Sequence, residues 1–532
     1  MNDKPISTNN PTQSDAATAP LYSGNTDSLH RAEVRFAPLH ELVLTQADYD
    51  RFHAFVLNRI GLDFQEDKRA MLGRGLAQVM STIGCQNLNE LYARLNAYPT
   101  TSVIWDQVIS VLTIGETYFF RNTSHFDALA KIILPGIIAE REHSNRRIRI
   151  WSAGCASGEE PYSLAILLRE TIPNLESWNV LILATDLNRE ALKKAQEGHY
   201  GAWSFRGVEK RVQDQYFRLD GNQYVIDDKI KEMVAFDYLN LVGDPFPSLT
   251  NNTNAMDIII CRNVTIYFNE PTTRAIVQKF HACLVNGGWL IPGPSEPNLI
   301  YYGDFTAQNF PGTVVYQKPN ALRIKSRPEP AFAFTPTPTF AAQPAVMLNM
   351  PRATPHLPIA PPIKKAPAPD LYHQALDLLQ AGQTNAALAK LYEKIDQDAK
   401  FAPAYSTLGK IYANMGNLEE AQHWCERAIR LDKLHAEPYY TLSLVYQQHG
   451  LMDMAIDALK KTIYLDRDFA LARYNLAQIF RHQGEKDLAR RELQNVQRLL
   501  QSKPPDELVS EGDGLIVGRL LELVKGELEL DQ

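Results

Sequence analysis

Between residues 148 and 163 the chain reads Ile-Arg-Ile-Trp-Ser-Ala-Gly-Cys-Ala-Ser-Gly-Glu-Glu-Pro-Tyr-Ser, a β-type run that opens through a turn into a helix start. Gly154 and Gly158 let the backbone approach a ligand that a side chain would block. Ser157 and Glu160 fit a capping box at the start of the helix. The stretch is typical of an α/β domain that presents a helix N-terminus to a nucleoside-like cofactor. Its glycine spacing differs from G-x-G-x-x-G, which disfavours a nicotinamide dinucleotide.

The sequence on either side of this stretch alternates strand-like and helix-like segments. This order predicts a Rossmann-like α/β fold with a doubly wound, mostly parallel sheet that binds its ligand at the carboxyl ends of the strands. The expected strands are 148–153, 180–184, 234–236, 258–261 and 289–292, followed by a hairpin that ends near 314–317. The expected helices between them include 161–171, 189–196 and 272–285.

Composition excludes several classes of function. The chain has 532 residues, enough for about three domains. Its net charge of −7 disfavours a nucleic-acid partner. No apolar run approaches the roughly 18 residues of a membrane span, so we expect no direct membrane insertion. The five cysteines form no C-x-x-C pair, which fits reduced thiols in the cytoplasm better than disulfides or a metal site.

Periodicity and composition divide the chain into successive parts. Thirteen of the 32 prolines fall between Pro319 and Pro369, in a segment that should form an extended spacer. The expected parts are a disordered tail at 1–40, a helical domain at 41–115, the α/β domain at 116–319 with a small β-subdomain at about 205–235, the Pro-rich linker at 320–368, a repeat array at 369–502 and an acidic tail at 503–532. Residues 515–530 of that tail suit one more amphipathic helix.

The array repeats every 34 residues. Glycines recur at Gly382, Gly416, Gly450 and Gly484, and alanines recur at 387, 421, 455 and 489. The period and pattern resemble the tetratricopeptide repeat (TPR), a helix–turn–helix unit. Stacked repeats form an all-α solenoid with a concave face, so we expect this region to bind a protein partner there and to carry no catalytic pocket.

Polar residues follow several of the expected strands, where the sheet would place its ligand. Each has a structural alternative: Asp186 as a helix cap, Arg262 in a surface ion pair, Phe119 in core packing, and Tyr267 as a buried aromatic. Because these polar residues occur one after another at the ends of successive expected strands, they favour a single ligand-binding site. An acidic residue after the second strand can accept the hydroxyls of a ribose, and an amide after the third can contact an adenine edge.

These motifs, taken together, resemble those of the CheR family of chemotaxis-receptor methyltransferases, which use S-adenosylmethionine to methylate glutamates on methyl-accepting chemotaxis proteins. The matching stretches are E-T-Y-F-F-R at 116–121, the stretch at 151–163, A-T-D at 184–186, 240–241, C-R-N-V-T-I-Y-F at 261–268 and G-P-S-E at 293–296. The resemblance implies no metal and places cofactor contacts on Gly115, Thr117, Arg121, Glu159, Asp186, Asn240, Leu241, Arg262 and Asn263. Gly115 stands where the family often has Asn, so only its backbone is available. Tyr267 and Arg121 would lie nearest the chemistry.

The resemblance also bears on partners. The segment at 216–225 is about three residues shorter than in members that recognise a receptor pentapeptide, so this chain resembles the pentapeptide-independent branch. Arg59, Lys68, Arg69 and Arg74 either face acidic receptor helices or are merely solvated. Members with such repeats serve dedicated signalling arrays in the cytoplasm, where the repeats would recruit or regulate. The alternatives are a non-catalytic adapter that senses S-adenosylmethionine and, less in keeping with the acidic charge, a small-molecule or nucleic-acid methyltransferase.

Overall fold

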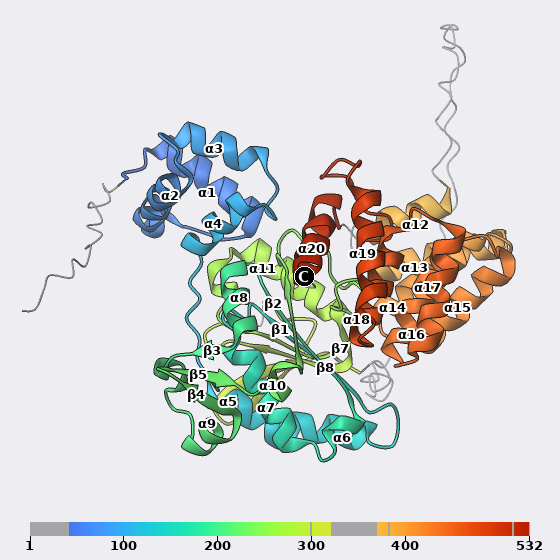
Figure 1. Ribbon diagram of the computed structural model, residues 1–532, viewed down its shortest axis with the longest axis horizontal. Helices are drawn as coiled ribbons and strands as arrows, with labels where there is room; N and C mark the ends of the chain where they lie inside the picture. The colour runs from blue at the N-terminus through green and yellow to red at the C-terminus, as the bar shows by residue number, and fades with distance from the viewer. Residues whose placement is uncertain (1–41, 298–299, 321–369, 381–382, 513–514, 531–532) are drawn as a thin grey trace, which may run out of the picture. The chain divides into compact units, whose positions relative to one another are not determined.

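The computed structural model describes residues 42–297, 300–320, 370–380, 383–512 and 515–530 (Figure 1). The expected tail at 1–40, the linker from 321 to 368 and the repeat glycine Gly382 lie outside the described residues. Within the described part of the chain, no helix is both long and apolar enough to cross a membrane.

A helical domain precedes the sheet. The side-chain hydroxyl of Thr45 caps its first helix, which ends at Gly61 with φ of 79°, a left-handed conformation that glycine adopts at low cost. The rings of Phe52 and Trp105 are fully buried in its apolar core. The helices are α1 (Gln46–Ile60), the short η1 (Glu66–Lys68), α2 (Arg69–Ile83), α3 (Leu88–Ala97) and α4 (Val103–Leu112).

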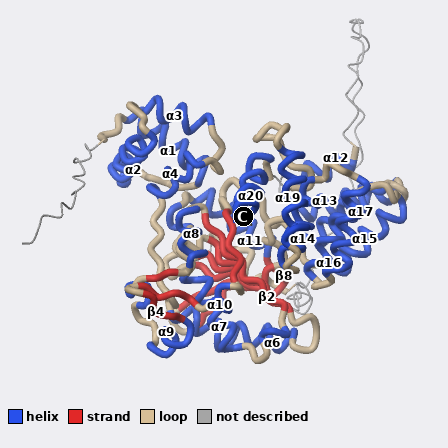
Figure 2. Tube along the Cα trace, viewed as in Figure 1, coloured by secondary structure: helices blue, strands red, loops and turns tan. Residues whose placement is uncertain are grey.

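The central sheet has seven strands in the order β6-β2-β1-β7-β8-β10-β9. The first five pair in parallel, and β10 pairs antiparallel with both β8 and β9, which confirms the predicted Rossmann-like fold. In Figure 2 these strands form the centre of the α/β domain, with helices around them. The strands are β1 (Arg147–Ala153), β2 (Asn179–Asp186), β6 (Val234–Tyr238), β7 (Met256–Cys261), β8 (Leu284–Pro292), β9 (Thr306–Phe310) and β10 (Thr313–Gln317).

Both faces of the sheet are packed, as a parallel sheet requires. Along β1, Ile148 and Ile150 belong to one core, whereas Trp151 and Ala153 belong to another that includes Phe280 of α11. The chain proceeds from β1 outward to β2 and β6 and then returns to the other side of β1 as β7. This reversal of strand order is a topological switch point, where α/β sheets bind ligands. The helices are α5 (Thr123–Ala128), η2 (Leu129–Ile133), α6 (Leu134–Arg141), α7 (Glu159–Thr171), η3 (Leu175–Ser177), α8 (Arg189–Glu197) and α11 (Glu270–Cys283).

A small antiparallel sheet lies between α8 and β6 in the chain. Its strands are in the order β3-β5-β4, and β4 and β5 are joined by the tight turn Gly221–Asn222. The ring of Phe119 is buried against Phe205 and Phe217, so Phe119 packs in the core and is no cofactor contact. The elements are β3 (His199–Tyr200), η4 (Ala202–Phe205), α9 (Lys210–Tyr216), β4 (Phe217–Asp220), β5 (Gln223–Ile226) and α10 (Asp228–Lys231).

Paired helices follow residue 369. Gly416, Gly450 and Gly484 each have φ between 74° and 80° in the turn within a pair, which explains why glycine recurs there. The recurring alanines are fully buried between helices. The region is therefore the predicted TPR array. Its helices are α12 (Leu371–Gln380), α13 (Thr384–Gln397), α14 (Ala402–Asn414), α15 (Leu418–Leu431), α16 (Glu437–Gln448), α17 (Met452–Leu465), α18 (Ala470–His482) and α19 (Lys486–Leu500), followed by α20 (Val517–Leu530).

Candidate functional site

The turn after β1 is shaped by two glycines in left-handed conformation. Gly154 has φ of 84°, and a Cβ added there would meet Val264 Cγ2 at 2.4 Å. Gly158 has φ of 92° and is itself the N-cap of α7, with no side-chain cap. The predicted capping box is therefore wrong. The Ser157 hydroxyl contacts the Glu159 carboxylate at 2.7 Å, and Glu160 is bonded elsewhere.

Asp186 joins the β1 turn to the end of β2. Its carboxylate oxygens accept N–H bonds of 2.8 Å from Ala156 and from Asn188. Burial raises the pKa of the Asp186 carboxyl, and these N–H bonds act in the opposite direction. The cap of α8 is the Asn188 side chain, which accepts from the Ala191 N–H at 3.1 Å. Asp186 is thus no helix cap, and it lines the cavity at the strand ends.

Glu160 and Arg262 form a buried ion pair beneath that cavity. The Glu160 carboxylate accepts from Arg262 Nε at 2.6 Å and from the Ser152 hydroxyl at 2.6 Å. The two charged side chains are 9% and 4% exposed, so Arg262 forms no surface pair. Arg262 also donates to the backbone carbonyl of Arg121, which ties the segment before the sheet to the end of β7. Glu160 and Arg262 both line the cavity.

The structure places Glu159 outside the cavity lining. Its carboxylate accepts from the hydroxyls of Ser157 and Ser204, and burial raises its pKa. Of the two adjacent glutamates, Glu160 therefore faces the cavity and Glu159 faces away from it. The sequence signal was the Glu159–Glu160 pair itself, in which the family resemblance placed the cofactor contact on Glu159.

The loop after β7 is organised by Glu296. This buried carboxylate accepts from the backbone N–H groups of Asn263, Val264 and Gly293 at 2.9, 2.9 and 2.6 Å. Asn263 has φ of 58°, and this loop carries Tyr267 at the end of η5 (Thr265–Tyr267). Glu296 was part of the G-P-S-E stretch, yet its role as an anchor was not predicted. The loop's shape is fixed because one carboxylate satisfies several N–H groups at once.

The helical domain contributes one wall of the same cavity. Asn240 Nδ2 donates to the Arg59 carbonyl at 2.9 Å, and the Asp63 N–H donates to the Tyr267 carbonyl at 2.8 Å. A Cβ at Gly61 would meet Val242 at 2.4 Å, so the end of α1 packs directly on the segment after β6. Ile60, Leu62 and Leu112 line the cavity from this side, and none of the three was predicted to do so.

Most of the predicted site residues line one cavity of about 200 Å³ at the strand ends. Leu239 and Leu241 give it an apolar wall, and Asp186 a carboxylate. Burial raises the pKa of the half-buried Tyr267 phenol, while the nearby Arg121 guanidinium lowers it. The predicted residues that line it are Gly115, Thr117, Arg121, Asp186, Asn240, Leu241, Arg262, Asn263 and Tyr267.

The cysteines near this cavity are buried thiols. Burial raises the pKa values of Cys155 and Cys261 well above the ordinary thiol range, so neither is a ready thiolate. All five cysteines are free and buried. Among the described residues, no group of three or more His, Cys, Asp or Glu side chains is placed to hold a metal ion.

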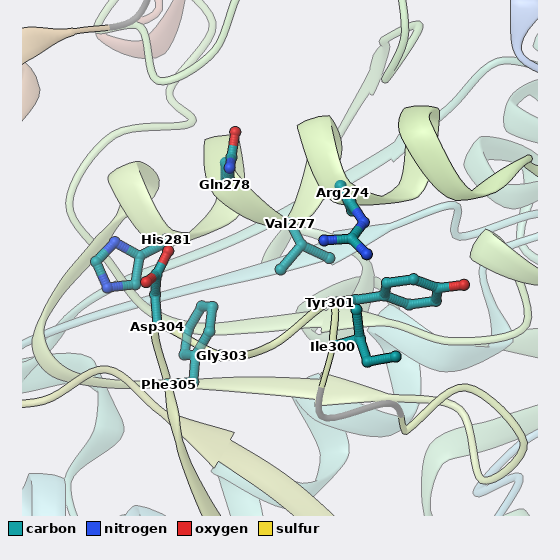
Figure 3. Close-up of a pocket in the computed structure, with 9 residues that line it drawn as sticks. All are labelled: Arg274, Val277, Gln278, His281, Ile300, Tyr301, Gly303, Asp304 and Phe305. Atoms are coloured by element: carbon teal, nitrogen blue, oxygen red, sulfur yellow. The ribbon is translucent and has the colours of Figure 1, made fainter.

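Figure 3 shows a second cavity, of about 210 Å³, between α11 and residues 300–305. The His281 and Phe305 rings meet edge to face there, with centroids 5.0 Å apart. The Arg274 guanidinium lies 5.6 Å from the centre of the Tyr301 ring. None of the residues predicted from the sequence lines this cavity, so the strand-end cavity is the candidate active site.

A doubly wound sheet with a carboxylate at the end of β2 and a glycine turn after β1 forms a nucleotide-type cofactor site. Family comparison agrees: residues 115–300 match the CheR methyltransferase SAM-binding domain, and residues 47–113 match the CheR all-alpha domain. Residues 378–443 and 436–469 match tetratricopeptide repeats.

Chemotaxis protein methyltransferase 2 of Vibrio cholerae is 33% identical over 284 residues, which cover 53% of this chain and 96% of that protein. The chemotaxis protein methyltransferase of Borreliella burgdorferi is 34% identical over 48% of this chain and 89% of its own. The chain belongs to the chemotaxis protein methyltransferase family and is an S-adenosylmethionine-dependent methyltransferase with appended TPR repeats. The probable biofilm formation methyltransferase WspC of Pseudomonas aeruginosa is 28% identical over 73% of this chain and 92% of its own, so that match extends into the repeats.

The residues of the cavity fit this cofactor. Asp186 is a carboxylate whose two N–H bonds leave further lone pairs for ribose hydroxyls. Leu239 and Leu241 provide an apolar surface suited to a purine. Glu160 and Arg121 supply a carboxylate and a guanidinium of the kinds that a zwitterionic amino-acid group requires.

Proposed function

We propose that this chain transfers the methyl group of S-adenosylmethionine to glutamate side chains on the cytoplasmic helices of chemotaxis receptors, which yields glutamate methyl esters and S-adenosylhomocysteine. The observation that carries the proposal is the single cavity at the switch point, lined by Asp186, Arg121 and Tyr267. The names of the related proteins support a role in chemotaxis.

The chemistry demands positioning more than acid or base catalysis. A glutamate carboxylate, with an ordinary pKa of about 4.3, is already ionised at neutral pH. When bound, S-adenosylmethionine supplies a methyl group activated by its sulfonium for in-line displacement. The residues of this chain therefore have to align the acceptor and exclude water, and orientation alone can contribute about 7–11 kcal/mol.

Three groups of residues divide the binding task in this proposal. Asp186 holds the ribose hydroxyls, while Leu241 and the backbone at Asn240 frame the adenine. Thr117, Arg121 and Glu160 hold the amino-acid end; Glu160 takes this role in place of Glu159, whose carboxylate is bonded to serines. Buried hydrogen bonds to a charged group contribute about 1.5–3 kcal/mol each, so this set gives the site its affinity.

Tyr267 is the residue that we assign to the acceptor. Because burial raises the pKa of its phenol, the hydroxyl keeps its proton at neutral pH and can donate to an incoming carboxylate. The Arg121 guanidinium on the same cavity wall adds a positive charge that attracts the acceptor. Both residues orient the substrate, and neither needs to exchange a proton.

The receptor would approach beside the helical domain. Arg74 is exposed on α2, whereas Arg69 is held by Glu66 at 2.8 Å and by the Leu44 carbonyl at 2.6 Å. Arg74 is therefore better placed than Arg69 to meet acidic receptor helices. The short turn at Gly221–Asn222 fits recognition without a receptor pentapeptide. This function places the protein in the cytoplasm, at receptor arrays.

The experiment is transfer of a labelled methyl group from S-adenosylmethionine to a receptor cytoplasmic fragment. The proposal expects label on the receptor that alkali releases as methanol, since esters hydrolyse where methylated amines and amides persist. Alkali-stable label would point to another acceptor group. Binding of S-adenosylhomocysteine without any transfer would support the non-catalytic adapter instead.

A further inference from the structure

The residues after the last repeat fold back onto the array. The apolar side chains Val517, Leu520 and Val524 of α20 are fully buried and share a core with α19. Before α20, Val509 is buried, and its N–H donates to the Leu515 carbonyl at 2.8 Å. Residues 503–512 and 515–530, named the C-terminal segment below, are thus bound to the repeats through both a loop and a helix.

The first helices of successive repeats form one continuous face. Tyr372 bonds Thr407 at 3.1 Å, and Tyr440 bonds Asn475 at 3.1 Å, so equivalent positions 68 residues apart make the same contact with the next first helix. Tyr474 lies one 34-residue period after Tyr440 and occupies the same position on α18. Stacked repeats use such a face as their concave binding surface.

The C-terminal segment is anchored on this face by carboxylates at two places. Glu527 accepts from the Tyr474 hydroxyl at 2.7 Å and from Gln478 Nε2 at 2.7 Å, and it pairs with Arg481 at 3.2 Å. These donors lie at intervals of four and three residues, which places them on one side of α18. One carboxylate is therefore held by a hydroxyl, an amide and a guanidinium together.

The second anchor lies at a distant repeat. Glu511 pairs with Lys410 of α14 at 3.0 Å, and the two side chains are 18% and 30% exposed. Gln478 is equivalent to Lys410 two repeats later, because 68 residues separate them. The C-terminal segment therefore runs along the inner face from α14 to α18 and occupies the surface that such arrays offer to protein partners.

The chemistry of the segment defines the kind of ligand that the face accepts. Residues 503–530 contain seven acidic and three basic side chains, together with the apolar row on α20. The groups that hold the two anchor carboxylates are Lys410, Tyr474, Gln478 and Arg481. A face of this kind suits an amphipathic helix with acidic residues, since carboxylates bound by cationic donors make strong, specific hydrogen bonds.

We propose that the C-terminal segment is an intramolecular ligand of the array's inner face, and that this face binds an acidic amphipathic helix of a protein partner in exchange for it. A tethered ligand has an effective concentration in the millimolar range, so a free partner of equal intrinsic affinity competes poorly until the internal contacts are weakened. Arg519 of the segment is paired with Asp237 of β6 at 3.8 Å, and Glu522 with Arg189 of α8 at 3.6 Å. Exchange of the segment would thus also change contacts next to the cofactor edge of the sheet.

The test uses the full-length chain and a fluorescent synthetic peptide of residues 503–530 as the probe. The double variant Glu511→Ala/Glu527→Ala keeps every apolar anchor but loses both carboxylates. We expect it to bind the probe at least tenfold more tightly than the wild type, measured by fluorescence anisotropy. Glu507→Ala is the matched control, because in the described contacts the Glu507 carboxylate pairs only within the segment, with Lys503 at 2.9 Å. This variant should bind the probe with the same affinity as the wild type.

A second comparison locates the probe. Adding Lys410→Ala and Arg481→Ala to the double variant should abolish the gain in affinity, since the groups that receive the carboxylates are then removed. Circular dichroism and thermal unfolding verify that each variant remains folded. The proposal is overturned if the wild type and the double variant bind the probe equally, whether tightly or not at all. It is also overturned if the gain persists without Lys410 and Arg481.

Discussion

The side-chain amide of Asn240 donates a hydrogen bond of 2.9 Å to the backbone carbonyl of Arg59, and this bond joins the helical domain to the cofactor cavity. The same side chain accepts from the Val242 N–H at 3.0 Å through Oδ1. From the sequence, the Asn240 amide was predicted to contact an adenine edge. In the structure its amide also closes the cavity, because it holds the end of α1 against the segment after β6.

Replacing Asn240 by Ala should therefore affect both folding and binding. Loss of the two bonds leaves buried backbone groups without these partners, which costs about 1–3 kcal/mol of unfolding free energy. We expect S-adenosylhomocysteine affinity to fall about tenfold, which corresponds to about 1.4 kcal/mol. Denaturant unfolding and titration calorimetry measure the two effects. Asn96→Ala, which removes only an exposed contact to the Arg59 side chain, is the control and should change neither.

Asp186→Ala should weaken binding of S-adenosylhomocysteine severely. The ribose hydroxyls would lose a charged acceptor worth about 1.5–3 kcal/mol, or roughly 10- to 150-fold in the dissociation constant. Calorimetric titration checks this value. Asp214→Ala removes a carboxylate whose ion pair with Lys210 is exposed, and it should bind like the wild type. An unchanged dissociation constant for Asp186→Ala would remove this residue from the site.

The two adjacent glutamates should respond differently to the same change. Glu160→Gln leaves the buried Arg262 guanidinium without its charged partner, and breaking a buried pair costs about 3–5 kcal/mol. Glu159→Gln keeps an amide oxygen that can accept from one of the Ser157 and Ser204 hydroxyls, and its Nε2 can donate to the other, so its cost in unfolding free energy should stay below about 1 kcal/mol. Urea unfolding of the two variants, together with their affinities for S-adenosylhomocysteine, distinguishes the two residues. Equal effects would contradict the assignment of Glu160 to the cavity.

Tyr267→Phe should retain S-adenosylhomocysteine affinity and lower turnover, since the phenol orients the acceptor. One lost hydrogen bond to a charged carboxylate corresponds to about a 10- to 100-fold slower transfer. The raised pKa of the Tyr267 phenol keeps this group protonated at neutral pH, so the wild-type rate should show no loss from its ionisation there. A parallel loss of cofactor affinity would show that Tyr267 supports the loop and not the acceptor.

The free energy of unfolding should decrease as the pH falls, because of His125. Burial, with the neighbouring Arg262 charge as the second cause, lowers the pKa of His125 to about 4, below the ordinary 6.5. The unfolded chain therefore binds this proton first, and stability is lost as the pH falls from about 6.5 toward 4, by up to about 3 kcal/mol. Arg262, itself paired with Glu160, is the charged side chain that contacts this imidazole.

His125→Gln isolates that contribution, because the glutamine does not titrate. Denaturant unfolding at pH 7 and pH 5 should show a larger loss for the wild type than for the variant. His281 also has a lowered pKa, and it remains in both proteins, so the comparison cancels its effect. Equal losses in the two proteins would contradict the assignment to His125.

The fold could be predicted from the sequence because its signals are local. The apolar run of β1 and the periodic Gly and Ala residues of the array each follow from short-range pattern, and both were found where expected. The strand β8 starts five residues before its predicted start, since Leu284 pairs with Met256 of β7, and Gly287 and Gly288 bond the backbone of Lys318, which follows β10. Neighbouring strands decide such boundaries.

The details of the site depended on contacts between distant residues. Which of Glu159 and Glu160 faces the cavity is set by Arg262 and Ser152, 102 and 8 residues from Glu160 in the chain. The anchoring of the loop by Glu296 and the wall formed by Ile60 likewise require the folded arrangement. The placement of the C-terminal segment on the array follows from side-chain contacts that no repeat pattern contains.

In the proposed function, the cavity beside Asp186 directs methyl groups to receptor glutamates. The most direct measurement is mass-spectrometric mapping of a receptor cytoplasmic fragment after incubation with the full-length protein and S-adenosylmethionine. We expect methyl esters on glutamate side chains of the receptor helices, and their loss when Asp186→Ala replaces the wild type. Methyl groups on any other kind of side chain, or an unmodified receptor in the presence of protein that binds S-adenosylhomocysteine, would contradict it.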